Sequence, residues 1–146
     1  MKPYRIYLAG PLFTVGERAF NLDLAERISA AATKRPITVL LPQAFCAHLE
    51  SAGAPDFPAI RRACLAHLAK ADLVLAILDG PDIDSGTAYE CGVAFVKGIP
   101  AIGLRTDLRP SENGVGNCMI TAPITVHRTV GAVVADAVRR SRGGRR

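Results

Sequence analysis

Residues 73–90 read LVLAILDGPDIDSGTAYE, and this stretch decides how the chain is organised. Its first part, Leu73 to Leu78, is an unbroken apolar run, which predicts a strand over 72–78 that is buried on both faces of a sheet. Its last residues lead into a helical pattern over 87–97, which Gly98 ends. A strand followed closely by a helix is the repeating unit of an α/β fold.

The connection between this strand and this helix is crowded with carboxylates. They belong to Asp79, Asp82, Asp84 and Glu90. Like charges at close range are unfavourable unless the protein uses them, because each disfavours the ionised form of the others. Ligands of open α/β sheets bind outside the carboxyl ends of the strands. The junction is therefore the candidate functional site.

Strands and helices alternate along the rest of the chain. Further strands are predicted over 4–9, 37–41, 100–104 and 124–126, and further helices over 16–33, 57–70 and 129–140. Residues 43–56 predict a loop with a short helical piece, and residues 105–123 predict a long functional or interface loop. The alternation predicts an α/β fold, a doubly wound five-stranded parallel sheet with helices on both faces, like flavodoxin and Rossmann domains.

Length and composition predict one domain over residues 1–140, followed by a basic flexible tail over 141–146. Apolar stretches fall short of the about 20 residues that span a bilayer, and the N-terminus resembles a strand rather than a signal peptide. We therefore expect a cytoplasmic location and no membrane partner. The four cysteines and three histidines are scattered singly, so neither a metal site nor a disulfide is expected.

The formal net charge of +5 comes from the C-terminal arginines. Residues 1–138 carry 13 basic and 13 acidic side chains, which balance. Aromatic side chains interleaved with basic ones, which stacking on bases requires, are missing from this sequence. We interpret the arginines as a solvated helix end and tail, and expect no nucleic-acid partner.

Glu90 is the candidate nucleophile. A helix N-terminus stabilises an ionised carboxylate, so the start of the 87–97 helix is expected to keep Glu90 deprotonated. The alternative is a capping box, in which Thr87 is the N-cap and Glu90 folds back onto its amide. The three aspartates upstream favour the first interpretation, because a cap does not require them.

Asp84 lies six residues before Glu90, across a predicted turn at Ser85-Gly86 where glycine would let the backbone approach a ligand. Two carboxylates at one site suggest glycosyl chemistry, in which one attacks the anomeric carbon and the other manages a proton on the leaving group. The alternative for Asp84 is a turn or N-cap residue. Asp79 ends its strand and suits either role.

The first strand leads into Gly10-Pro11, a tight exit, and into Phe13, which could cover an aromatic ligand. Parallel topology places the end of this strand beside the third strand, near Glu90. Tyr7 could therefore hydrogen-bond the Glu90 carboxylate and orient it. The alternative is that Tyr7 is a core residue.

Four segments resemble the nucleoside 2-deoxyribosyltransferase family. They are IYLAGPLF at 6–13, DGPDIDSGTAYECG at 79–92, KGIPAIGLRTD at 97–107, and the Asn-x-Met element at 117–119. They follow the family's order and span most of the chain. The resemblance implies a doubly wound fold and a retaining exchange of 2-deoxyribose between nucleobases.

The resemblance also implies roles for individual residues. Glu90 would form a covalent deoxyribosyl-enzyme, Tyr7 would hold Glu90, and Asp84 would contact or protonate the base. Asn117 resembles a residue that a neighbouring subunit contributes to the sugar's 5′-hydroxyl. The substrate-binding set implied in this way is Gly10, Phe13, Asp79, Ser85, Gly86, Asn117 and Met119.

The expected partners are deoxynucleosides, free nucleobases and further copies of this chain, in a homodimer or hexamer that completes the site. No cofactor is expected. Two features depart from the family pattern. Cys64 stands where members often carry Asp or Asn, and the arginine-rich end stands where some carry a site tyrosine.

Two other functions stay open. One is an N-glycosidase of 2′-deoxynucleosides or their 5′-monophosphates, in which water accepts the sugar. The other is a non-catalytic nucleotide-binding module, against which the lack of a G-x-G-x-x-G or Walker A pattern counts.

Overall fold

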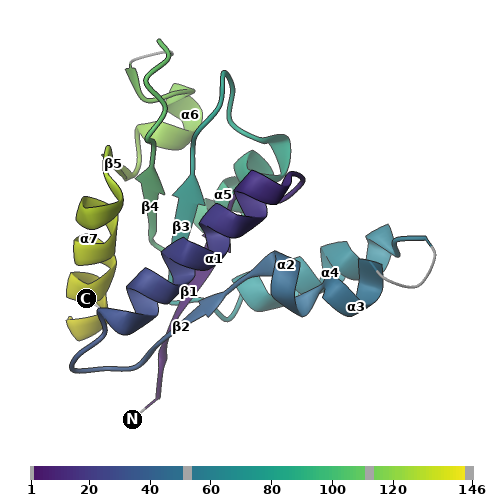
Figure 1. Ribbon diagram of the computed structural model, residues 1–146, viewed down its shortest axis with the longest axis horizontal. Helices are drawn as coiled ribbons and strands as arrows, with labels where there is room; N and C mark the ends of the chain where they lie inside the picture. The colour runs from purple at the N-terminus through teal and green to yellow at the C-terminus, as the bar shows by residue number, and fades with distance from the viewer. Residues whose placement is uncertain (1, 51–53, 111–113, 144–146) are drawn as a thin grey trace.

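The predicted fold is confirmed in the computed structural model, which describes residues 2–50, 54–110 and 114–143. Five parallel strands form one sheet in the order β2-β1-β3-β4-β5 (Figure 1). The strands are β1 (Tyr4–Ala9), β2 (Ile37–Leu40), β3 (Leu73–Ile77), β4 (Ala101–Leu104) and β5 (Thr125–His127). The strand order reverses between β1 and β3, where such sheets bind ligands outside their carboxyl ends.

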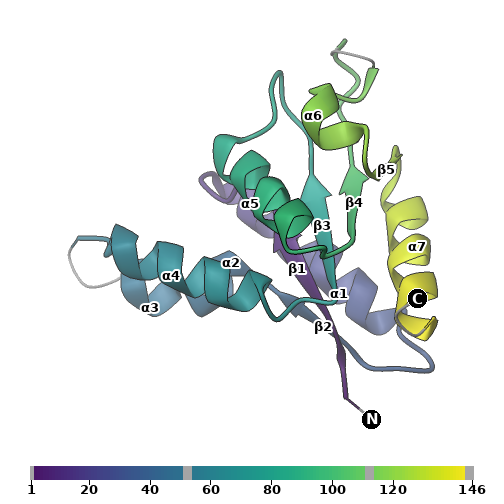
Figure 2. The same cartoon turned by 180° about the vertical axis from the view of Figure 1, so that it is seen from behind.

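Helices cover both faces of the sheet. They are α1 (Val15–Ala30), α2 (Pro42–Phe45), α3 (Ala47–Glu50), α4 (Phe57–Leu68), α5 (Ser85–Val96), α6 (Cys118–Thr121) and α7 (Val130–Arg142). Helices α1 and α7 lie on the face seen in Figure 1, and α5 lies on the opposite face, toward the viewer in Figure 2. Helices α2, α3 and α4 project sideways from the sheet. None of the helices described has the length and apolar character needed to cross a membrane.

The core follows the two-residue alternation of the strands. In β3, Leu73, Leu75 and Ile77 belong to the cluster beneath α1 and α7, while Val74 and Ala76 belong to the cluster beneath α5. The same alternation in β1 turns Tyr7 toward α5. Tyr7 is thus a core residue on the face that carries the helix after β3.

The first helix starts and ends earlier than the predicted range of 16–33. Its N-cap is Thr14, whose hydroxyl accepts from the Glu17 amide at 3.2 Å, while Glu17 Oε2 accepts from the Thr14 amide at 2.8 Å. This capping box fixes the start at Val15. Leu24 and Ile28, four residues apart, are fully buried and form the inner face of the helix.

Two other segments are more helical than predicted. The segment 43–56, expected to be mostly loop, contains α2 and α3, which follow β2 directly. Helix α7 extends to Arg142, two residues into the predicted tail, because Ser141 is buried and Arg142 donates to Thr33 Oγ1 at 3.0 Å. The last part of that tail, 144–146, lies outside the described residues.

Gly103 in β4 tests how tightly the α5 face is packed. A Cβ at this position would lie 2.6 Å from Leu78 Cδ1, which is buried. We expect Gly103→Ala to lower the free energy of unfolding by about 1–3 kcal/mol, as overpacked cores do. The matched control is Gly92→Ala on the exposed side of α5, where nothing lies within 4 Å. It should raise stability by up to about 1 kcal/mol. Urea denaturation measures both, and shifts in the same direction would contradict the packing argument.

Candidate active site

The helix after β3 begins two residues earlier than predicted. Its N-cap is Asp84, not Thr87, and Ser85 and Gly86 are its first helical residues rather than a turn. Asp84 Oδ2 accepts from the Thr87 amide at 2.9 Å and from its hydroxyl at 3.1 Å. The capping-box alternative for Glu90 is therefore wrong, because Glu90 lies in the second turn of the helix, beyond reach of the cap.

Glu90 instead points to the sheet. The phenol of Tyr7 donates a hydrogen bond of 2.5 Å to Glu90 Oε1, across 83 residues of sequence. Tyr7 has no exposed surface, so its phenol is fixed by the packing of β1 between its neighbours. The contact expected from the parallel topology is present. Both interpretations of Tyr7 hold, since it is a core residue that bonds the candidate nucleophile.

The expected ionisation of Glu90 is wrong in one respect. Burial raises the pKa of Glu90 to about 7, the hydrogen bond from Tyr7 opposes this rise, and the charge of Asp84 adds to it. Stabilisation by the start of α5 does not keep the pKa low. Burial and the Glu90 charge also raise the pKa of Tyr7 far above its ordinary value, so the phenol stays a donor.

Asp84 is the N-cap of α5, as the alternative interpretation predicts. Its charge also raises the pKa of Glu90. The two following residues have little freedom. A Cβ at Gly86 would lie 3.1 Å from Asp84 Oδ2, so the missing side chain leaves room for the capping carboxylate. Ser85 is exposed at the start of the helix.

Cys64 of α4 lies near the same pair. Burial and the charge of Glu90 raise the pKa of the Cys64 thiol. Tyr7 and Cys46 lie near this thiol. Phe45, at the end of α2, stacks on His67 with ring centroids 3.9 Å apart and is tilted against Tyr7 at 6.4 Å. The sequence did not single out Phe45 or His67. The Phe45 segment has no periodic pattern, and no motif includes His67.

The loop after β1 is held close to β3. A Cβ at Gly10 would come within 2.9 Å of Ile77 Cδ1, so glycine is needed for close packing there. The buried Asn21 donates to Pro11 O and to Gln43 Oε1, both at 3.0 Å. Phe13, predicted to cover a ligand, is 76% exposed.

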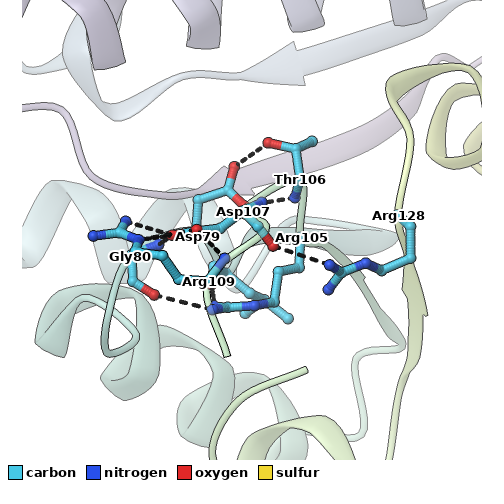
Figure 3. A network of polar contacts seen from close by, with 8 residues as sticks. Asp79, Gly80, Arg105, Thr106, Asp107, Arg109 and Arg128 are labelled. Atoms are coloured by element: carbon cyan, nitrogen blue, oxygen red, sulfur yellow. Dashed lines mark hydrogen bonds and ion pairs between the residues drawn. The ribbon is translucent and has the colours of Figure 1, made fainter. Parts of the chain in front are cut away.

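The remaining predicted residues lie on neighbouring loops. Asp79 Oδ1 accepts from the amides of Thr106 and Asp107, which ties it to the end of β4 (Figure 3). Asn117 is the N-cap of α6 and accepts from the Met119 amide at 3.0 Å. Met119 is 79% exposed. A hydrogen bond thus joins Tyr7 to Glu90, the charge of Asp84 acts on Glu90, and Phe13 and Met119 face solvent.

A hollow of about 1160 Å³ lies at the other end of the strands. Its lining includes Tyr4, Asp72 and Ala101, which stand at or before the amino ends of β1, β3 and β4. None of the predicted site residues lines it. We place the candidate site at Glu90 because the hydrogen-bonded Tyr7–Glu90 pair lies there, on the helix that follows the carboxyl end of β3. Within the described ranges, no group of three or more His, Cys, Asp or Glu side chains could hold a metal ion.

Comparison with solved structures gives the same fold. A conserved protein of Enterococcus faecalis V583 has a TM-score of 0.82 at 29% identity, covering 95% of this chain and 99% of that chain. The 2-deoxyribosyltransferase of the psychrotolerant bacterium Bacillus psychrosaccharolyticus has a TM-score of 0.71 at 23% identity, covering 89% and 90%. The 2-desoxiribosyltransferase of Leishmania mexicana has a TM-score of 0.70 at 23% identity, covering 94% and 98%.

Among curated proteins, none matches this chain. Residues 6–137 match the family model described as Nucleoside 2-deoxyribosyltransferase. This range contains Tyr7, Asp84 and Glu90, the three residues that the structure brings together. The chain therefore belongs to the nucleoside 2-deoxyribosyltransferase family.

Proposed function

We propose that this chain exchanges 2-deoxyribosyl groups between nucleobases through a covalent bond to Glu90. The observation that carries the proposal is the 2.5 Å hydrogen bond from the buried Tyr7 phenol to Glu90 Oε1. It holds one carboxylate oxygen and leaves the other to react. Family membership supports the reaction class.

The chemistry needs two displacements at the anomeric carbon. In the first, a Glu90 oxygen bonds to C1′ while the C1′–N bond breaks, and the bonding electrons and a proton go to the departing base. In the second, a nitrogen of the incoming base attacks C1′ and releases Glu90. Two inversions restore the configuration at C1′. Asp84, whose charge reaches Glu90, is the candidate for managing the proton on the base.

The exposed residues suggest how the site is completed. Phe13 and Met119 present large apolar side chains to solvent, and Asn117 stands at the exposed start of α6. We propose that the chain forms a homo-oligomer in which a neighbouring copy's Asn117 contributes to the sugar pocket. The proposed substrates are 2′-deoxynucleosides and free nucleobases, and the proposed setting is nucleotide salvage in the cytoplasm.

Glu90→Gln should abolish base exchange, because an amide oxygen is a poor nucleophile. The loss should exceed a thousandfold in kcat, on the scale seen when a nucleophile is removed. The assay incubates deoxyinosine with adenine and follows deoxyadenosine by liquid chromatography. Glu26→Gln is the matched control, since Glu26 is an exposed carboxylate on α1. This variant should exchange bases at the wild-type rate.

The same assay without adenine separates the transferase from the N-glycosidase. Hypoxanthine released at a rate that does not depend on adenine would favour the hydrolase. A 2-deoxy-2-fluoro analogue should slow the second displacement and leave a label on Glu90, which peptide mass spectrometry would locate. A label on another residue would contradict the assignment of the nucleophile.

The pH dependence follows from the ionisation of Glu90. A carboxylate must be deprotonated to attack, so kcat/KM should rise with pH through about 7. Tyr7→Phe removes the hydrogen bond that lowers the pKa of Glu90, so the midpoint should move to higher pH. Tyr4→Phe is the control, because Tyr4 is a buried tyrosine on the other face of the same strand. A Tyr7→Phe midpoint at or below that of the wild type would contradict the role of this bond.

Stability should also change with pH. The pKa of Glu90 rises on folding from an ordinary 4.5 to about 7, so its favourable contribution is full below about 4.5 and is lost as pH rises through about 7. Glu90→Gln removes this titration. Between pH 4.5 and 8, the free energy of unfolding of the variant should rise relative to the wild type. Urea denaturation at the two pH values tests this, and a constant difference would show that Glu90 is not destabilised by burial.

A further inference from the structure

A buried arginine lies directly after β4, near the candidate site but outside its reacting groups. Arg105 has no exposed surface. Its guanidinium donates to Leu78 O at 2.5 Å and to Gly80 O at 3.2 Å, and its Nε–H has no hydrogen-bond partner in the part of the chain described. Burying a guanidinium against backbone carbonyls is costly. An apolar residue here would leave Leu78 O and Gly80 O without these donors, so the arginine does more than fill the core.

That use is visible at Gly80. Arg105 holds the carbonyl of Gly80, and Asp107 Oδ2 accepts from its amide at 3.0 Å. Gly80 has a φ of 120°, and a Cβ there would lie 2.9 Å from Asp82 O. Only glycine adopts this conformation readily. Side chains from the segment after β4 therefore fix an unusual backbone conformation in the loop after β3.

Asp79, in the loop after β3, in turn bonds the segment that follows β4. Its Oδ1 accepts from the amides of Thr106 at 2.6 Å and Asp107 at 2.8 Å, and its Oδ2 accepts from Thr106 Oγ1 at 2.7 Å. We call this set, Asp79, Gly80, Arg105, Thr106 and Asp107, the strand-end network (Figure 3). The last sheet hydrogen bond between these strands runs from the Leu78 amide to Leu104 O. The strand-end network continues the pairing of β3 and β4 beyond it.

Two further arginines hold the Asp107 side of the network. Arg109 forms an ion pair with the Asp107 carboxylate, and its hydrogen bonds hold the pKa of Asp107 well below the ordinary value. Arg128, after β5, donates to Asp107 O at 2.9 Å and to Gly114 O at 3.1 Å. Asp107 thus stays ionised at neutral pH, and the network is anchored to the segment that follows β5.

The loop held in this way leads to Asp84. Gly80 is four residues before Asp84, and Asp84 is the N-cap that starts α5, the helix that carries Glu90. We propose that Arg105 is a positioning residue, which through the strand-end network fixes the loop over 79–84 and so sets where Asp84 stands relative to Glu90. The consequence for catalysis rests on the proposed function. The consequence for the geometry does not.

The charge on Glu90 reports that geometry in the absence of substrate. Tyr7 from β1 and Asp84 from the start of α5 act on the pKa of Glu90, whose charge in turn raises the pKa of the Cys64 thiol of α4 and of the neighbouring Cys91 thiol of α5. Of these, only Asp84 is joined to the strand-end network by a short loop. Because the Asp84 charge raises the pKa of Glu90, moving Asp84 away should lower that pKa.

The test uses two variants and one matched control. Arg105→Lys keeps the positive charge but replaces the planar donor pair that spans two carbonyls. Asp79→Asn weakens the opposite side of the network and protects the test if Arg105→Lys does not fold. Asp72→Asn is the control, since Asp72 precedes β3 as Asp79 follows it and accepts from the Arg5 amide at 3.0 Å. Asp79→Asn and Asp72→Asn make the same kind of loss at the two ends of β3.

Two measurements are made on folded protein, whose structure is checked by circular dichroism. Carbon-13 NMR titration of the Glu90 carboxyl without substrate should give a lower pKa in Arg105→Lys and Asp79→Asn than in the wild type, and an unchanged pKa in Asp72→Asn. Base-exchange kinetics should show kcat reduced by roughly tenfold or more in the two network variants, since small displacements of a catalytic group are costly. KM should change less than kcat.

A folded Arg105→Lys or Asp79→Asn variant with the wild-type Glu90 titration would overturn the proposal, whatever its activity. A lower Glu90 pKa in Asp72→Asn as well would also overturn it, because the effect would then be a general result of weakening β3. Absence of exchange by the wild-type protein would count against the proposed function alone. The carboxyl titration would still decide whether Arg105 positions the loop.

Discussion

The partly buried hydrogen bond between Tyr7 and Glu90 is the interaction on which the rest of the site depends. It exists because two regular patterns coincide. The alternation of β1 turns Tyr7 toward the α5 face, and the start of α5 at Ser85 places Glu90 on the side of the helix that faces the sheet. A helix that began at Thr87 would still contain Glu90, but as a capping residue bonded to its own backbone. The position of the N-cap therefore decides whether Glu90 bonds its own backbone or the Tyr7 phenol.

The sequence predicts the sheet well because its signals are local and repeated. Each strand boundary lies within one residue of its predicted place, since apolar runs bounded by glycine and proline are unambiguous in a parallel sheet. The start of α5 was missed because Asp84 and Thr87 are both good N-cap residues, and Glu90 completes a box with the second. Only the burial of Glu90 against Tyr7, 83 residues away in sequence, distinguishes them.

The strand-end network shows a second limit of sequence reasoning. Asp79 is predicted to bind substrate or to end its strand, and no local pattern predicts that its carboxylate accepts from amides 27 and 28 residues later. Arg105 has no local pattern that predicts burial, because an arginine after a strand is normally solvated. Such residues are found only when the register of β3 against β4 is known, since it places Ile77 beside Leu104 and so brings the two following loops together.

The four carboxylates of the junction have separate uses, and this separation explains why their crowding is tolerated. Asp79 accepts from two amides and a hydroxyl, Asp82 accepts from the Ile83 amide, and Asp84 accepts from Thr87. Each of these acids therefore has at least one backbone N–H as a hydrogen-bond partner. At Glu90, burial raises the pKa, and the hydrogen bond from the Tyr7 phenol only partly opposes this rise. Three hydrogen-bonded aspartates thus shape the backbone around Glu90, the carboxylate that we propose as the nucleophile.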